Sequence, residues 1–127
     1  MARLIRFGEE EVVARGDGIE SVRLTPKPLQ DQGFVMGVTS FPPGTSLRLH
    51  SHNTVEQVTI IEGEGFAELN GEVMPARPYD TTQIAPGELH RFINDGSTTM
   101  RILWVYGSTH VTRTFADTGE TVEQFEL

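Results

Sequence analysis

Two of the four histidines in this chain, His50 and His52, are separated by a single residue. In a β-strand, residues i and i+2 lie on the same face, so we expect these two imidazoles to point together. Glu56 keeps the same parity, and a tight turn around Asn53-Thr54 would return its carboxylate to the pair. His90 opens another predicted strand, which could lie beside the first. Neutral imidazoles with one carboxylate suit Fe²⁺, Mn²⁺, Zn²⁺, Ni²⁺ or Cu²⁺ and leave coordination positions open.

Other interpretations of these polar residues stay open at this point. A His-X-His pair alone is also typical of two exposed side chains on a half-solvated strand. Gln57 is a rival of Glu56 as a ligand, but it has the opposite parity, so the spacing favours Glu56. The fourth histidine, His110, follows the last predicted strand of the central region and is interpreted as a surface residue.

The elements that would position these side chains are short strands. Glycines and prolines divide the sequence into segments rich in β-branched and aromatic residues. Asn70-Gly71 is a strong signal for a type I′ hairpin turn, and Pro42-Pro43-Gly44 and Pro86-Gly87 mark further turns. The pattern predicts an all-β sandwich or barrel. The predicted strands are Arg3–Phe7, Phe34–Phe41, Ser46–Leu49, Glu56–Glu62, Gly65–Leu69, Thr81–Ile84, His90–Ile93 and Met100–Tyr106.

The two ends of the chain allow two interpretations. Glu9–Thr25 and Val111–Phe125 both carry alternating apolar residues. Such segments are typical either of covering strands within the same chain or of arms that pack on a partner. We therefore expect one domain over residues 1–127, with a barrel core at about 34–106 and terminal strands or arms on either side.

Composition narrows the class of protein. The 127 residues carry a formal net charge of −8, which argues against non-specific nucleic-acid binding. There is no apolar run of the roughly 20 residues that a membrane helix needs, and no apolar region behind the arginines near Met1. The chain has no cysteine, which excludes disulfides, thiolate metal sites and a thiol nucleophile. We expect a soluble cytoplasmic protein with a small-molecule or metal ligand.

Two spaced motifs resemble those of the cupin superfamily. The first runs from Gly44 through five residues to His50-Ser51-His52, then three residues to Glu56 and six residues to Gly63. The second motif is matched in its later half, where Gly87, two residues, His90, three residues and Asn94 follow one another. The sequence departs from the pattern at Tyr79, where a glycine is usual, and at Ala85, where a proline is usual. The resemblance covers about residues 34–106.

The resemblance implies a fold and a ligand set. A cupin is an antiparallel double-stranded β-helix, or jelly-roll barrel, with one divalent transition metal ion in its mouth. The ligands carried over are His50, His52, Glu56 and His90, and the identity of the metal is left open. Both departures lie in turns, away from the ligands. Asn94 is expected to support the end of its strand through local hydrogen bonds. Small cupins commonly form homodimers, so a homodimer is the expected assembly.

Candidate residues for the cavity wall come from parity and size. Arg48 shares the parity of His50 and His52, so in a regular strand from Ser46 its guanidinium would face the same interior and pair with a substrate carboxylate. A late strand start or a bulge would place it in solvent instead. Four large side chains could line the barrel and contact substrate, although each is also typical of a simple core residue; they are Met36, Phe92, Trp104 and Tyr106.

Two classes of function follow from a metal with open coordination positions. The first is a metal-dependent enzyme of the dioxygenase, isomerase or lyase type that acts on a small oxygenated or carboxylate-bearing molecule. The second is a non-catalytic sensor or storage module that binds a metal or small ligand. The ligand set favours the first class, and the sequence identifies no substrate.

Overall fold

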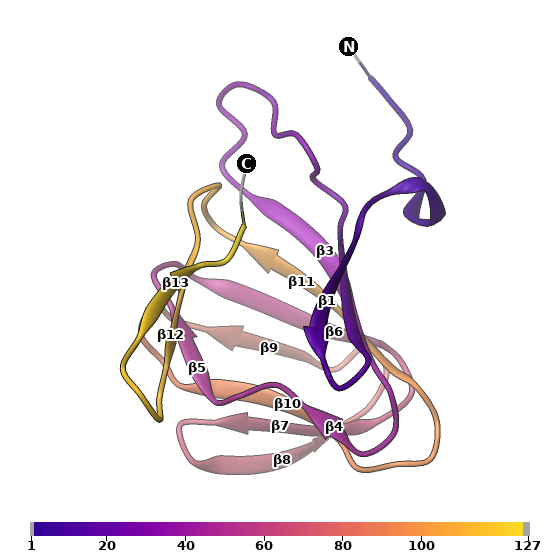
Figure 1. Ribbon diagram of the computed structural model, residues 1–127, viewed down its shortest axis with the longest axis vertical. Helices are drawn as coiled ribbons and strands as arrows, with labels where there is room; N and C mark the ends of the chain where they lie inside the picture. The colour runs from indigo at the N-terminus through magenta and orange to yellow at the C-terminus, as the bar shows by residue number, and fades with distance from the viewer. Residues whose placement is uncertain (1, 126–127) are drawn as a thin grey trace.

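The computed structural model describes residues 2–125 and is built almost entirely from strands (Figure 1). One short 3-10 helix, η1 (Phe7–Glu9), precedes them. In order along the chain, the strands are β1 (Val12–Gly16), β2 (Ile19–Arg23), β3 (Val35–Phe41), β4 (Thr45–Ser46), β5 (His50–His52), β6 (Glu56–Glu62), β7 (Gly65–Leu69), β8 (Glu72–Ala76), β9 (Thr81–Ile84), β10 (His90–Asn94), β11 (Met100–Tyr106), β12 (Thr112–Phe115) and β13 (Thr121–Glu123).

The strands form two antiparallel sheets. One sheet has the order β1-β2-β3-β11-β6-β9, and the other has the order β13-β12-β5-β10-β7-β8, with β4 paired to β10. Neighbours in each sheet are mostly distant in the sequence, as a jelly roll requires. The expected all-β, antiparallel jelly-roll fold is confirmed. None of the described residues forms a helix long and apolar enough to cross a membrane.

Local signals predicted most of the central strands. The predicted bounds of β6, β7, β9 and β11 match the structure, and those of β3 and β10 differ by one residue. Asn70 and Gly71 have φ values of 50° and 87°, which fits the predicted type I′ turn between β7 and β8. The strand after that turn, β8, contains Pro75 and lies at a sheet edge, where a missing backbone donor is tolerated.

Two predicted strands were wrong. Arg3–Phe7 is extended chain that leads into η1, and it lies away from both sheets (Figure 1). Ser46–Leu49 is interrupted, because β4 ends at Ser46 and β5 begins only at His50. In the interruption, Leu47 packs against the hydrophobic core. The side chains between β4 and β5 therefore do not alternate regularly between the two faces of a sheet.

Both terminal segments pack on the chain's own barrel. β1 and β2 form a hairpin whose second strand pairs with β3. β12 pairs with β5 and also with β13. In this structure β1, β2, β12 and β13 thus pair with strands of the same chain and extend the sheets beyond the core predicted at 34–106.

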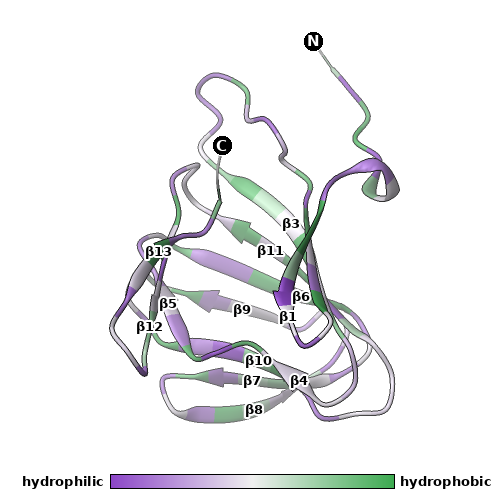
Figure 2. Cartoon of the chain, viewed as in Figure 1, coloured by the Kyte–Doolittle hydropathy of each residue, from purple (hydrophilic) through white to green (hydrophobic). Residues whose placement is uncertain are grey.

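The interior between the sheets holds the hydrophobic core. Apolar stretches are concentrated in β3 and β11, whereas β5, β6 and β10 carry hydrophilic stretches (Figure 2). Trp104 of β11 lies opposite Gly37 of β3 and is buried. A Cβ atom at Gly37 would overlap the Trp104 ring, so glycine at this position makes room for the indole.

Candidate metal centre

The three histidines of the two motifs come together on one sheet. His50 and His52 are the ends of β5, and His90 opens β10 directly opposite His50 in the antiparallel ladder. Residues directly opposite each other in such a pair present their side chains on the same face. Glu56 opens β6 in the other sheet and faces them across the interior. All four side chains are buried.

Each imidazole is oriented by a backbone carbonyl. The Nδ1–H groups can donate to the carbonyls of Arg48 at 2.6 Å from His50, of Thr112 at 2.9 Å from His52 and of Glu88 at 3.0 Å from His90. A proton on Nδ1 leaves the lone pair of Nε2 free. This arrangement of a histidine with a carbonyl behind it is typical of metal ligands, because it fixes both the ring and its tautomer.

The ring atoms that face inward converge on Glu56. Glu56 Oε1 lies 3.0 Å from His90 Nε2 and 3.7 Å from His52 Nε2. One potential ligand atom from each of His50, His52 and His90 lies within 4.8 Å of the others, so the three histidines could hold a metal ion. Glu56 Oε1 and His90 Nε2 are buried and have no hydrogen-bond partner. Two buried atoms that face each other without a hydrogen bond fit a site built for a cation between them.

The electrostatics of the pocket keep His50 and His52 neutral. Burial and, to a smaller extent, the neighbouring His90 lower the pKa of His50 to about 3. Burial also lowers the pKa of His52 to about 2, with further contributions from His50 and His90. Neutral imidazoles are the form that binds metals. The cluster is therefore ready to bind a cation at neutral pH.

A tyrosine completes the wall beside the carboxylate. Tyr106 of β11 lies opposite Glu56 of β6, so both side chains face the interior. Its hydroxyl is 3.3 Å from His52 Nε2. Burial raises the pKa of Tyr106 well above its usual range, and the carboxylate of Glu56 raises it further. The phenol thus stays protonated and can donate a hydrogen bond into the site.

The alternatives to the predicted ligands lie outside the site. Gln57 is exposed on the outer face, as its parity predicted. His110 is an exposed residue whose Nε2 lies 3.2 Å from Glu123 Oε1. Its interpretation as a surface histidine is confirmed.

Two predicted wall residues were wrong. Arg48 does not line the cavity beside the histidines: it is exposed, its Nη2 donates to Asp117 Oδ1 at 2.6 Å, and its guanidinium lies over the ring of Phe115. The cause is the interruption between β4 and β5, which removes the alternation that would have turned it inward. Met36 lies opposite Val105 in the β3–β11 ladder, on the face away from Trp104 and Tyr106.

The other three predicted wall residues lie in the interior. Phe92, Trp104 and Tyr106 are buried and line an innermost cavity of about 30 Å³ together with His50, Glu56 and His90. Such a volume is enough for an ion or a few water molecules. The aromatic rings exclude water from the ligand atoms on the remaining sides.

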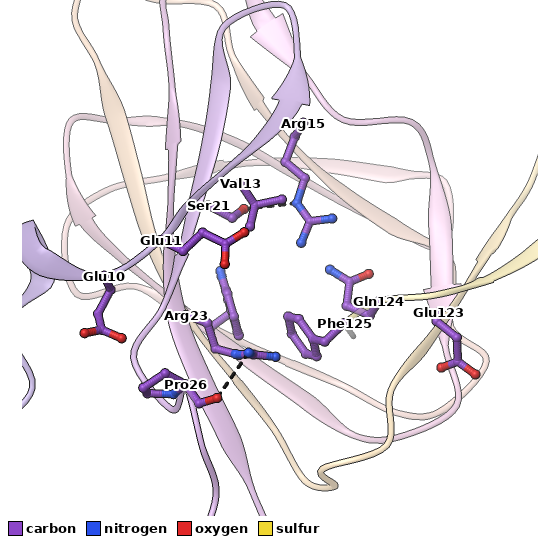
Figure 3. A pocket seen from close by; sticks show the side chains of 11 residues that line it. Glu10, Glu11, Val13, Arg15, Ser21, Arg23, Pro26, Glu123, Gln124 and Phe125 are labelled. Carbon is purple, nitrogen blue, oxygen red and sulfur yellow. Dashed lines mark hydrogen bonds between the residues drawn. The ribbon is translucent and has the colours of Figure 1, made fainter. Parts of the chain in front are cut away.

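A larger cavity of about 580 Å³ adjoins the innermost one (Figure 3). The two cavities are neighbours that share four lining residues, which are Arg15, Ser21, Trp104 and Gln124. Phe125 of the C-terminal segment stacks on Trp104 with ring centroids 5.5 Å apart. The outer cavity is large enough for a small organic ligand.

Sequence reasoning missed two arginines of this site. Arg15 of β1 and Arg113 of β12 both line the innermost cavity. The alternating apolar residues of both terminal segments did indicate strands there. However, Arg15 lies where the register of the β1–β2 hairpin shifts between Ala14 and Gly16, so alternation does not fix its direction, and the partner of Arg113, β5, is set by long-range pairing.

The fold and the two-motif geometry agree with a family match. A model of the cupin domain family, Cupin_2, matches residues 37–106. The chain belongs to the cupin family. The matched range contains all four residues of the candidate metal centre, whereas Arg15 and Arg113 lie on the flanking strands.

Curated relatives of this cupin include L-ectoine synthases. The enzyme of Vibrio parahaemolyticus is 38% identical over 74 residues, which are 58% of this chain and 56% of the relative. The enzyme of Vibrio campbellii is 36% identical over the same length. The cupin thus spans little more than half the length of these relatives in the match.

Solved structures of cupins superpose on most of the chain. A sugar phosphate isomerase of the cupin superfamily from Silicibacter pomeroyi has a TM-score of 0.78 at 22% identity, covering 96% of this chain and 87% of the other. A protein described as a predicted oxalate decarboxylase, from Thermotoga maritima, has a TM-score of 0.74 at 27% identity, covering 84% and 99%. These likenesses confirm the expected cupin fold.

Proposed function

We propose that this cupin binds one divalent transition metal ion through His50, His52, His90 and Glu56. The observation that carries the proposal is the pair of buried atoms, Glu56 Oε1 and His90 Nε2, that face each other at 3.0 Å without a hydrogen bond. The three Nδ1–carbonyl contacts support it, because they aim the Nε2 lone pairs at the same space.

We further propose that the protein is a metal-dependent enzyme for a small oxygenated or carboxylate-bearing molecule. Three imidazoles and one carboxylate leave two positions of an octahedron open, where a bound ion would act as a Lewis acid toward an oxygen ligand. Tyr106 would donate its phenolic proton in a hydrogen bond to that ligand. Phe92 and Trp104 would exclude bulk water. The cavity of about 580 Å³ offers room for the remainder of the molecule.

The relatives support an enzyme but not one reaction. An ectoine synthase, a sugar phosphate isomerase and a predicted oxalate decarboxylase carry different activities on related chains. Their shared feature is the cupin fold. The reaction type, dioxygenase, isomerase or lyase, is therefore left to experiment.

The proposal is tested first by metal content. Protein purified without chelator is analysed for Fe, Mn, Zn, Ni and Cu, beside the variants His90→Ala and His110→Ala. We expect about one ion per chain in the wild type and in His110→Ala, and a loss of most of it in His90→Ala. Equal metal content in all three proteins would overturn the metal site.

The enzyme proposal is tested on the metal-loaded protein. Small hydroxy acids, keto acids, β-diketones and sugar acids are incubated with it, and products are followed by mass spectrometry. Turnover that stops in His90→Ala supports an enzyme. Binding of a ligand without turnover would favour the non-catalytic sensor or storage function instead.

The oligomeric state and the cellular location of the protein remain predictions. We propose a homodimer, because an apolar N-terminal arm that extends away from the barrel exposes Leu4 and Phe7, and Val12 of β1 is exposed near it (Figure 1). Light scattering would then give twice the chain mass of 14.1 kDa. A monomer mass would contradict the homodimer. A cytoplasmic location also stays a prediction.

A further inference from the structure

Two guanidinium groups from opposite sheets meet beside the candidate metal centre. Arg15 lies on β1 in one sheet, and Arg113 lies on β12 in the other. Arg113 is directly opposite His52 in the β12–β5 ladder, so its side chain shares the inward face of that histidine. Both arginines line the innermost cavity with His50 and Glu56.

Neither of these arginines has an acidic partner among residues 2–125. Four others do: the pairs are Arg48–Asp117, Arg77–Glu64, Arg91–Glu68 and Arg101–Glu62. The Nε of Arg113 is buried without any hydrogen-bond partner. Natural proteins rarely leave a buried cation unpaired, because its desolvation is then uncompensated.

Arg15 is nevertheless held in place. Its Nε donates to Ser21 Oγ at 3.3 Å, and Ser21 Oγ lies 2.8 Å from Thr39 Oγ1. Trp104 Nε1 donates to the same Thr39 oxygen at 2.8 Å. This chain of hydrogen bonds orients the guanidinium and uses only its Nε, so the two terminal nitrogens remain available. Figure 3 shows Arg15 pointing into the outer cavity, toward Gln124.

Arg113 makes a cation–π contact instead. Its guanidinium lies 5.0 Å from the ring centroid of Phe115, two residues along the same strand. Its Nε is buried and has no hydrogen-bond partner among the described residues. A guanidinium group that is held in place but lacks a hydrogen-bond acceptor in the protein can donate to an acceptor atom of a ligand.

The two positive charges lie close enough to affect each other. Burial lowers the pKa of Arg113, and the charge of Arg15 lowers it further, although an arginine keeps its proton in proteins. The other charged groups that line the cavities are Glu56 on the inside and, on the outer one, Glu10, Glu11, Arg23 and Glu123. An acidic protein has thus placed two cations in the lining of its innermost cavity, and Arg15 lines the outer cavity as well.

We propose that Arg15 and Arg113 form a binding subsite for an oxyanion, a carboxylate or phosphate, on the small molecule that occupies this cavity. The inference rests on the proposed function, since it adds a second anchor beside the proposed metal. Guanidinium groups bind such oxyanions through two parallel hydrogen bonds. The ligand class is therefore an oxygenated molecule with an anionic group at one end and a metal-binding oxygen at the other.

The test measures anion binding to metal-free protein by calorimetry. Malonate and inorganic phosphate are titrated separately into the wild type, Arg15→Gln, Arg113→Gln and the charge-matched control Arg77→Gln. Neutral malonamide serves as the uncharged probe. We expect at least one anion to bind the wild type and Arg77→Gln alike, with affinity reduced at least about 10-fold in Arg15→Gln and Arg113→Gln. Whichever anion binds more tightly identifies the oxyanion.

Several outcomes would overturn the subsite. They are wild type that binds neither anion, equal affinity for malonamide, or unchanged affinity in both glutamine variants. Circular dichroism and thermal melting check that each variant folds. Removal of one of two unpaired like charges is expected to leave the melting temperature unchanged or to raise it. If Arg113→Gln does not fold, Arg113→Lys takes its place in the titrations. Lysine keeps the positive charge but lacks the planar guanidinium group, so a lower anion affinity of this variant is expected.

Metal analysis of the same proteins separates the two proposals. Arg15→Gln and Arg113→Gln are expected to hold as much metal as the wild type. Anion binding that depends on these arginines in a protein without metal affinity would leave the subsite standing and remove the metal site. Metal binding together with an anion affinity that is unchanged in both arginine variants would leave the metal site standing and remove the subsite.

Discussion

His90 Nε2 and Glu56 Oε1 lie 3.0 Å apart in the interior of the barrel, and neither atom has a hydrogen-bond partner. The two residues come from opposite sheets, and the folding of the chain brings them together. The Nδ1 of His90 already has a carbonyl partner, so its proton is placed on the far side of the ring. A lone pair then faces a carboxylate, an arrangement that a bound cation between them would stabilise.

The pH dependence of stability follows from His50 and His52. In the metal-free fold, the pKa of His50 is lowered to about 3 and that of His52 to about 2, below the usual value of about 6.5 in the unfolded chain. Between these values the unfolded state binds more protons, so the free energy of unfolding falls as pH falls below about 6.5, by up to about 1.4 kcal/mol per pH unit for each histidine.

Urea unfolding of metal-free protein at pH 7, 6 and 5 measures this dependence. The variant His52→Asn is expected to show a smaller slope than the wild type, and the surface variant His110→Ala the same slope. A free energy of unfolding that stays constant from pH 7 to pH 5 would contradict neutral buried histidines.

Arg48 provides a test of which arginines belong to the cavity. Arg48→Ala removes a solvent-exposed ion pair with Asp117 and a contact with Phe115, so a loss of less than about 1 kcal/mol in stability is expected. Metal content and anion affinity should equal those of the wild type, because the side chain is exposed and lines neither cavity. A marked loss of anion affinity would mean that Arg48 reaches the site after all.

The packing of Trp104 depends on Gly37. A Cβ atom at Gly37 would overlap the Trp104 ring and approach the Val22 carbonyl. We expect Gly37→Ala to lower the free energy of unfolding by about 1–3 kcal/mol through overpacking. Gly33→Ala is the matched control, since nothing lies within 4 Å of the added atom. Equal denaturation midpoints for the two variants would contradict this close packing.

Tyr79 is strained where related sequences usually have a glycine. Its φ is 75°, in the left-handed region, and its side chain is exposed. This conformation costs a non-glycine residue about 1–2 kcal/mol. Tyr79→Gly is expected to raise stability by up to about 1 kcal/mol, whereas Tyr79→Ala retains the Cβ atom and brings no such gain. Thermal melts compare the three proteins, and a destabilised glycine variant would refute the strain.

The sequence predicted which four side chains gather in the interior. His50 and His52 share a face through local strand periodicity, and the resemblance to the cupin motifs added Glu56 and His90. Asn94 was also predicted to support its strand end. It does so with hydrogen bonds from its Nδ2 to the carbonyls of Phe41 and Thr98.

The two arginines beside the site were missed for different reasons. Arg15 lies where the register of the β1–β2 hairpin shifts between Ala14 and Gly16, so strand periodicity does not fix the direction of its side chain. Arg113 is placed by the pairing of β12 with β5, far away in the sequence, and no short-range pattern specifies that partner. Arg48 was misplaced for a related reason, since the period of two fails wherever a strand is interrupted.

Anomalous diffraction from crystals grown with Zn²⁺ would show whether the three imidazoles and Glu56 hold one metal ion. We predict one strong peak between the sheets, about 2.0–2.2 Å from the Nε2 atoms of His50, His52 and His90 and from a carboxylate oxygen of Glu56. Zinc bound only elsewhere, or a cluster without an anomalous peak, would contradict the account.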